Sequence, residues 1–170
     1  GGPQAGIILG PQELIQRMRG NPLYRALRPD KITIAALEAT LRLYQHPERL
    51  RERLPLLRML TTPLDVLRER ASRVRWALPA ALRERVALQD DVGYTGGGAL
   101  PREAVATVVL AVDPAPMSVD AAAKALRQNA PPVIARRAKG RLLLDFRTID
   151  PAEVETMSDA LRRLLTDASC

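Results

Sequence analysis

Apolar residues in the first half of the sequence recur with the spacing of helices. In residues 31–44, for example, Ile34, Leu37 and Leu41 fall three or four residues apart and form one stripe of a helix. Thr62, followed by Pro63, is predicted to cap the last helix of this half. The predicted helices cover residues 11–19, 31–44, 48–60 with a break at Pro55, and 64–78.

Strand patterns dominate after about residue 84. In residues 141–147 the apolar side chains of Leu142, Leu144 and Phe146 alternate with polar ones, as a strand with one buried face requires. The order predicts a small α+β domain with helices on one face of a largely antiparallel sheet. The predicted elements are strands 86–92 and 104–112, a helix 118–128 capped by Ser118, strands 132–136 and 141–147 turned at Lys139-Gly140, and a final helix opened by Asp150-Pro151-x-Glu153.

The apolar run at residues 7–10 predicts one further strand, near the start of the chain. A single strand cannot satisfy its own backbone hydrogen-bonding groups. We therefore expect its sheet to lie outside this sequence, which would make the chain the C-terminal piece of a longer protein.

Charge is unevenly distributed along the 170 residues, whose formal net charge is +7. Residues 1–85 contain 16 basic and 8 acidic residues, whereas residues 86–170 contain 10 and 11. Of the 26 basic residues, 23 are arginine. This excess indicates either a polyanionic partner such as RNA or a set of solvated, arginine-rich helix faces.

The sequence also excludes several classes of protein. No uncharged apolar run approaches the roughly 18 residues needed to cross a membrane, and the first residues do not resemble a signal peptide. The single cysteine, Cys170, excludes a disulfide framework and a cysteine-rich metal site. A cytoplasmic protein without a membrane partner is therefore expected.

Few residues are candidates for chemistry. His46 is the only histidine, and beside Pro47 it is interpreted as a polar helix terminator, with a catalytic base as the alternative. Asp90 and Asp91 are interpreted as part of a solvated turn, although they could bind a cation. The glycines at 96–98 could present backbone amides to a phosphate or simply allow a bulge.

The strongest candidates are Arg25 and Arg28, which lie three residues apart between Pro22 and Pro29. If the segment is helical, both guanidiniums point to the same side and could clamp a tetrahedral oxyanion. Two ordinary surface arginines remain the alternative.

Five sequence strings stand out: GGPQAGIILG at 1–10, NPLYRALRPDKITIAALEATLRLY at 21–44, GGGALP at 96–101, PPVIAR at 131–136 and GRLLLDFRT at 140–148. Together they resemble the bacterial selenocysteine synthases, which are L-seryl-tRNA(Sec) selenium transferases of the fold-type-I pyridoxal-phosphate (PLP) superfamily. The resemblance runs in order along essentially the whole chain, and its first two strings are the most specific.

The resemblance implies an α/β protein of the fold-type-I class. Residues 1–46 would end the large PLP-binding domain, 47–83 would form linking helices, and 84–170 would form the small α+β domain. The family converts seryl-tRNA(Sec) to selenocysteyl-tRNA(Sec) with selenophosphate, by PLP-dependent β-elimination and selenium addition. The resemblance also implies a homo-oligomer built from dimers.

The resemblance further assigns roles by position. The Schiff-base lysine is expected just upstream of Gly1, so this chain alone should be inactive, and Lys31 is not that lysine. Gly1 and Gly2 are expected beside the cofactor. Arg25 and Arg28 match the residues that are thought to bind selenophosphate.

For Arg136 and Arg147, in the second half of the chain, the sequence is compatible with two roles. Related enzymes use an arginine of the small domain to bind the substrate carboxylate, but in seryl-tRNA that carboxylate is esterified and uncharged. Arg136 and Arg147 are therefore expected either to contact tRNA or to be structural. For the protein as a whole, two alternatives stay open: a related PLP enzyme acting on a small amino acid or amino sugar, and a non-catalytic basic RNA-binding module.

Overall fold

The computed structural model describes residues 2–95 and 104–167, and the sequence divides into two units between Thr61 and Thr62. The first unit is helical throughout its regular elements. These are α1 (Gln12–Arg19), α2 (Pro22–Leu27), α3 (Lys31–Leu43), a 3-10 turn η1 (Pro47–Arg49), α4 (Leu50–Arg53) and α5 (Pro55–Thr61).

Side-chain caps explain where two of these helices begin. The Asn21 side chain accepts a hydrogen bond from the Leu23 amide at the start of α2. At the start of α3, Asp30 accepts from the Ile32 and Thr33 amides at 2.7 and 2.9 Å. The helices predicted over 11–19 and 31–44 are thus confirmed, and so is the break at Pro55, where Leu54 is extended.

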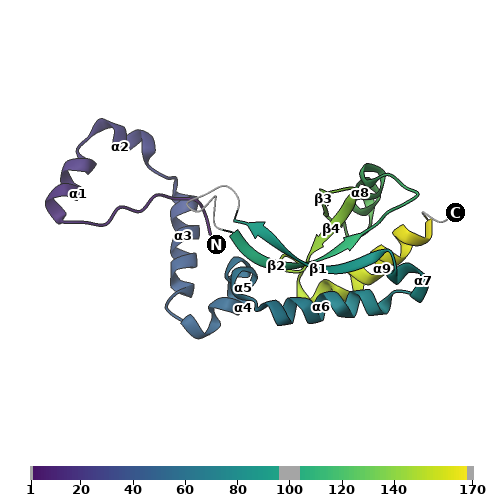
Figure 1. The fold of residues 1–170 in the computed structure, drawn as a ribbon. Coiled ribbons are helices and arrows are strands. Elements are labelled where there is room, and N and C mark those ends of the chain that lie inside the picture. The colour runs from purple at the N-terminus through teal and green to yellow at the C-terminus, as the bar shows by residue number, and fades with distance from the viewer. Residues whose placement is uncertain (1, 96–103, 168–170) are drawn as a thin grey trace. The chain divides into compact units, whose positions relative to one another are not determined.

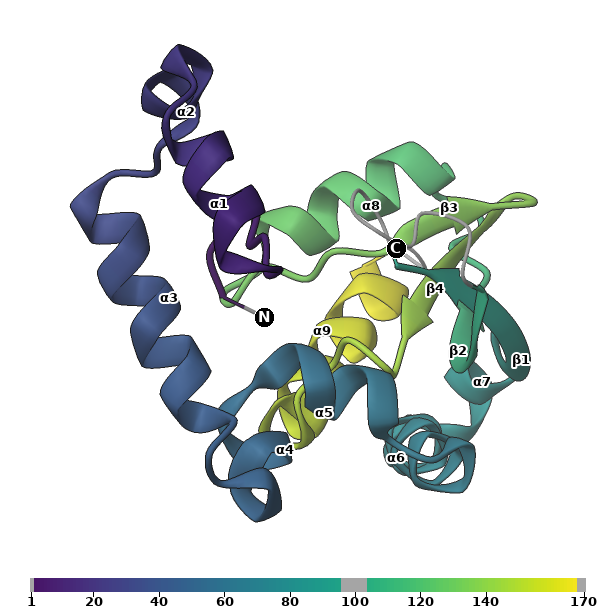
Figure 2. The same ribbon diagram turned by 90° about the vertical axis from the view of Figure 1, so that its left-hand side faces the viewer.

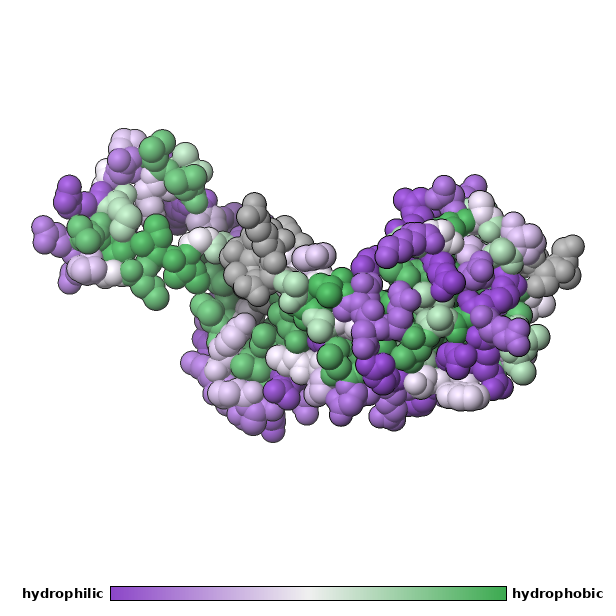
Figure 3. Space-filling model, viewed as in Figure 1, coloured by the Kyte–Doolittle hydropathy of each residue, from purple (hydrophilic) through white to green (hydrophobic). Residues whose placement is uncertain are grey.

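The predicted strand at residues 7–10 is wrong for the described structure, because no strand forms anywhere in residues 2–61. The segment has no neighbouring strand with which to pair, and Ile7, Ile8 and Leu9 are 55, 68 and 90% exposed. Figure 2 shows the stretch before α1 as plain connecting chain. Leu54 is the only buried residue of residues 2–61, and Figure 3 shows apolar side chains on the surface of this unit.

The second unit is built on a four-stranded antiparallel sheet of order β1-β2-β4-β3 (Figure 1). Its elements are α6 (Leu64–Ala77), α7 (Ala80–Arg83), β1 (Val86–Tyr94), β2 (Ala104–Val112), α8 (Val119–Gln128), β3 (Arg136–Ala138), β4 (Arg141–Asp145), a 3-10 turn η2 (Pro151–Glu153) and α9 (Val154–Asp167). The order strand, strand, helix, strand, strand, helix is confirmed. The linking helices expected over 47–83 fall partly in each unit.

One face of this sheet carries the main core. Alternate residues of β2 and β4, such as Val108, Leu110 and Leu144, pack with the apolar stripes of α6, α8 and α9. Phe146 is fully buried in the same cluster. The stripe predicted for the last helix is buried, at Val154, Met157, Leu161 and Leu164. The opposite face buries only a small apolar group, Val109, Ala111 and Leu143.

The sequence placed one strand of this unit wrongly. The strand predicted at 132–136 is instead β3 at Arg136–Ala138, because Pro132 has no amide hydrogen and the Val133 amide donates to the Leu126 carbonyl of α8 at 2.8 Å. The turn at Lys139-Gly140 is confirmed, and both residues have positive φ.

The start of α6 is also shifted by one residue. Pro63, not Thr62, occupies the N-cap position, so the predicted N-cap is wrong by one residue. Among the helices of residues 2–95 and 104–167, none combines the length and the hydropathy that crossing a membrane requires.

Candidate functional site

The Arg25–Arg28 segment lies between two capped helices of the first unit. Arg25 is on α2, which ends at Leu27. Arg28 has ψ 124° and is extended, because the following Pro29 disfavours helical backbone in the residue before it. The premise that both arginines share one helical face is therefore wrong, and any clamp would combine a helix residue with the extended residue after the helix.

Both guanidiniums are available to an anion. Arg25 and Arg28 are exposed, and among the described residues neither forms an ion pair or a side-chain hydrogen bond. The nearby carboxylate of Asp30 is committed to capping α3, where the Thr33 amide and hydroxyl, followed by the Ile32 amide, lower its pKa. Asp30 therefore stays ionised and bonded to its helix.

Gly2 makes a close approach that only glycine permits. Its φ is +112°, and a Cβ there would lie 2.8 Å from both Cγ2 and Oγ1 of Thr40 on α3. The Thr40 hydroxyl in turn donates to the Ala36 carbonyl at 2.8 Å. The family string thus needs a glycine here for packing against α3. Gly1 lies outside the described residues.

The described residues do not form a site for PLP. Such a site needs a lysine in an enclosed pocket, and the three lysines of the chain, Lys31, Lys124 and Lys139, are all exposed. None of them lines a described pocket. No catalytic step can therefore be assigned to these residues through the cofactor.

A polar network covers the second face of the sheet. Arg136 donates to Asp91 at 2.7 Å and to Asp145 at 3.3 Å. The buried Thr107 hydroxyl donates to the other Asp145 oxygen at 2.5 Å. The Val92 amide and then Arg136 hold the pKa of Asp91 below its usual value. Asp90, the other half of the predicted acidic pair, forms an ion pair with Arg68 on α6 at 2.5 Å.

Arg147 is held by main-chain carbonyls. Its Nε and one terminal nitrogen donate to the Ala106 carbonyl at 3.1 and 2.6 Å, and the other terminal nitrogen donates to the Thr62 carbonyl at 3.1 Å. Burial lowers the pKa of this guanidinium, and the neighbouring Asp145 opposes that shift. These contacts favour the structural role for Arg136 and Arg147, and a tRNA contact by either remains a prediction.

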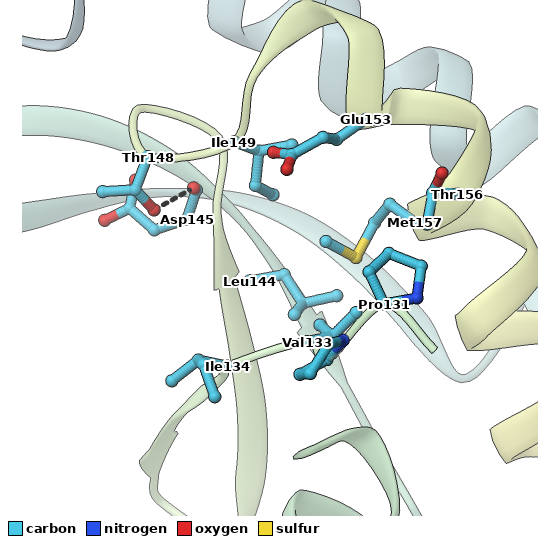
Figure 4. Close-up of a pocket in the computed structure, with 11 residues that line it drawn as sticks. Pro131, Val133, Ile134, Leu144, Asp145, Thr148, Ile149, Glu153, Thr156 and Met157 are labelled. Atoms are coloured by element: carbon cyan, nitrogen blue, oxygen red, sulfur yellow. Dashed lines mark hydrogen bonds between the residues drawn. The ribbon is translucent and has the colours of Figure 1, made fainter. Parts of the chain in front are cut away.

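The hollow beside the PPVIAR segment has few free polar groups. Its volume is about 200 Å³, and Figure 4 shows apolar side chains such as Leu144 and Met157 within it. The Thr148 hydroxyl donates to the Asp145 carbonyl at 3.0 Å, and the Glu153 carboxylate accepts from the Asp150 amide at 3.0 Å. These two side-chain groups are thus hydrogen-bonded to the local backbone.

The remaining candidates divide into described and undescribed residues. His46 precedes η1, after the last turn of α3, as expected of a terminator. Among the residues that the structure describes, no group of three His, Cys, Asp or Glu side chains could hold a metal ion. The glycines at 96–98 and Cys170 lie outside that part of the chain.

Two residues at these sites were not predicted. Asp145 joins Thr107 and Arg136, and its only sequence signal is its position inside the GRLLLDFRT string at the end of a strand. Thr40 packs on Gly2, a contact between residues far apart in sequence that no local pattern indicates.

Comparison with known proteins gives a consistent set of matches. The family model described as L-seryl-tRNA selenium transferase matches residues 1–150. The L-seryl-tRNA(Sec) selenium transferase of Nitratidesulfovibrio vulgaris is 43% identical over 167 residues, which are 97% of this chain and 36% of that protein. The proteins of the same name from Moorella thermoacetica and Klebsiella pneumoniae are 42% identical over 170 residues and 45% identical over 154.

These matches cover nearly all of this chain but only part of each relative. They cover 99% and 88% of this chain, but only 36% and 33% of the Moorella and Klebsiella proteins. The chain thus spans about a third of the length of the curated relatives it matches. The names of these relatives favour neither alternative, the enzyme for a small amino acid or amino sugar or the RNA-binding module.

Proposed function

Because this chain belongs to the L-seryl-tRNA selenium transferase family, we propose that it forms the C-terminal part of an enzyme that converts seryl-tRNA(Sec) to selenocysteyl-tRNA(Sec) with selenophosphate. The observation that carries this proposal is an identity of 39 to 45% to proteins of that name over nearly the whole chain. The full protein would be a homo-oligomer built from dimers.

Within this chain, Arg25 and Arg28 would bind the anionic selenium donor. Their support is the match to the family string, together with two exposed guanidiniums that lack carboxylate partners among the described residues. Charge-assisted hydrogen bonds from arginine to phosphate oxygens are short and strong, and the planar guanidinium matches their geometry. After selenium leaves, the same two groups would stabilise the released phosphate.

The cofactor would be bound by other parts of the full protein. We assign the Schiff-base lysine to a position before Gly1, and PLP supplies the electron sink for β-elimination. The part played by this chain would be to hold the donor through Arg25 and Arg28 and to bring Gly2 against α3. Residues 1–46 would belong to the PLP-binding domain and residues 84–170 to the small domain.

The test compares full-length enzymes carrying Arg25→Gln, Arg28→Gln or Arg19→Gln. Arg19 is an exposed arginine of α1 without an ion pair in the described residues, so it serves as the matched control. Each missing charge-assisted bond should weaken donor binding by about 1.5–3 kcal/mol, or roughly tenfold to a hundredfold. We expect the KM for selenophosphate to rise by this factor in the two site variants, with tRNA affinity unchanged.

The outcomes separate the function from the residue assignment. A wild-type enzyme that forms no selenocysteyl-tRNA from seryl-tRNA and selenophosphate would contradict the function. A wild-type enzyme that is active, with Arg25→Gln and Arg28→Gln matching Arg19→Gln, would remove these two arginines from the donor site.

A further inference from the structure

A pocket of about 160 Å³ follows the end of α3 in the first unit, and its lining is mostly basic. It is lined by Leu43, His46, Arg49 and Arg53. Leu43 ends α3, His46 is the N-cap residue of η1, Arg49 ends η1 and Arg53 ends α4. The pocket is open to solvent and contains no acidic residue in its lining.

The backbone explains why these four side chains face one hollow. They are spaced by three, three and four residues, which is the spacing of one side of successive helical turns. The chain stays wound through the junction, since the His46 amide donates to the Leu43 carbonyl at 3.1 Å and the Arg49 amide to the His46 carbonyl at 3.0 Å. The convergence is thus a property of a hydrogen-bonded segment.

The two arginines of this pocket have no carboxylate partner among the described residues. Arg42, which lies four residues before His46, forms an ion pair with Glu38 at 2.7 Å. By contrast, Arg49 and Arg53 have no ion pair or side-chain hydrogen bond in the described part of the chain. The carboxylate of Glu48 lies 3.7 Å from His46 Nδ1.

We propose that this pocket binds a phosphate group. Two guanidiniums supply forked donors that match tetrahedral oxyanions, the imidazole N–H adds a further donor, and Leu43 supplies an apolar wall. The group is either a phosphodiester of a bound RNA or free inorganic phosphate, which share this chemistry. The pocket uses neither Arg25 nor Arg28 and does not depend on the selenium-transfer proposal.

The experiment uses the full-length protein with Arg49→Gln and Arg53→Gln combined. The control is Arg51→Gln, which removes an exposed arginine of the same helix that does not line the pocket. Line broadening of the phosphorus NMR signal of inorganic phosphate reports phosphate binding. It is measured in an Arg25→Gln/Arg28→Gln background, so that the proposed donor site does not contribute. Fluorescence anisotropy with a tRNA(Sec) transcript, over a series of salt concentrations, reports RNA binding.

For an RNA phosphodiester we expect the double variant to bind tRNA about tenfold more weakly than the control. The slope of log affinity against log salt should fall by about one, as expected when the protein neutralises one phosphate fewer. Phosphate line broadening should fall as well. Circular dichroism checks that the fold is kept, and an Arg49→Lys/Arg53→Lys variant, which retains both charges, should recover the salt slope.

Each outcome decides the proposal. Loss of phosphate line broadening with unchanged tRNA binding supports the pocket, with free phosphate as its ligand. If both readouts equal those of Arg51→Gln, the pocket is not a phosphate site and the proposal is overturned. Absence of selenium transfer in the wild-type protein would contradict the proposed function and leave the pocket result standing.

Discussion

Replacing Asp145 by alanine tests whether the polar network on the second sheet face stabilises the domain. The Asp145 side chain is 14% exposed and accepts hydrogen bonds from the Thr107 hydroxyl, the Arg147 amide and the Arg136 guanidinium. Its removal leaves the Thr107 hydroxyl, in a residue 1% exposed, without its acceptor. The substitution should therefore destabilise the sheet at the junction of β2 and β4.

The magnitude follows from the three hydrogen bonds. A buried hydroxyl without a partner costs about 1–3 kcal/mol. Arg136 is 46% exposed and keeps its bond to Asp91, so its share is under about 1 kcal/mol. Because the Arg147 amide also loses its acceptor, Asp145→Ala should lower the free energy of unfolding by about 3 kcal/mol. Asp120→Ala also removes an aspartate that pairs with an arginine, Arg137, but one that is 80% exposed, so it should cost under about 1 kcal/mol.

Urea unfolding of the 170-residue chain measures this difference. The only tryptophan, Trp76 on α6, reports on the second unit by fluorescence. Thr107→Val in the Asp145→Ala background should cost much less than Thr107→Val alone, because the hydroxyl is already without an acceptor. The reasoning is refuted if Asp145→Ala lowers stability no more than Asp120→Ala, or if the two substitutions are additive.

Two further predictions follow from the site geometry. The pKa of Asp91 is depressed in the folded protein, so the ionised side chain stabilises the fold at pH values above the unfolded-state pKa of about 3.9. This stabilisation is lost as the pH falls below that value. Asp91→Asn should therefore flatten the dependence of stability on pH in the acidic range, which urea midpoints of the variant and the wild type measure. Gly2→Ala should destabilise the contact of this segment with Thr40 on α3 by about 1–3 kcal/mol, because alanine disfavours the positive φ and its Cβ would lie 2.8 Å from the Thr40 side chain. Hydrogen exchange of α3 amides in the full-length protein measures it, with Gly6→Ala, whose Cβ would meet nothing within 4 Å, as the control that should leave exchange unchanged.

The second unit could be predicted well because its sequence patterns are complete within the chain. The alternation of Leu142 and Leu144 identifies β4, and Asp150 with Glu153 forms the capping box expected from Asp-Pro-x-Glu. The strand predicted at 132–136 is wrong because the segment is apolar enough for a strand but begins with Pro132, which has no amide hydrogen to donate. Whether such a segment pairs as a strand depends on its hydrogen-bond partners, and here the Val133 amide is used by α8.

The first unit was predicted only at the level of its helices. The helical spacing of its apolar side chains predicts α1 and α3, yet Ile7, Leu9 and Leu27 are 55, 90 and 80% exposed. A hydrophobic pattern indicates that one face of an element is apolar, but it does not show which surface covers that face. For the same reason, the shared direction of Arg25 and Arg28 could not be derived from spacing, since Pro29 decides where the helix ends.

The arginine excess now divides by location. In the second unit, whose residues 62–170 contain 16 basic and 14 acidic residues, the described arginines often serve the fold. Arg75 and Arg83 each donate from Nε to a main-chain carbonyl at 2.8 Å and flank the Trp76 ring, at 5.8 and 4.8 Å from its centroid. Arg147 is bound to carbonyls in the same way.

The first unit differs in this respect, because residues 1–61 contain 10 basic and only 5 acidic residues. Asp30 is committed to a helix cap and Glu38 to Arg42, so few carboxylates remain to neutralise the arginines. Unpaired positive charges attract phosphate groups most strongly where several of these charges lie close together. Anion binding by this chain should therefore be concentrated in its first 61 residues, and substitutions of Arg25, Arg28, Arg49 and Arg53 should reduce it far more than substitutions of Arg75, Arg83 or Arg147.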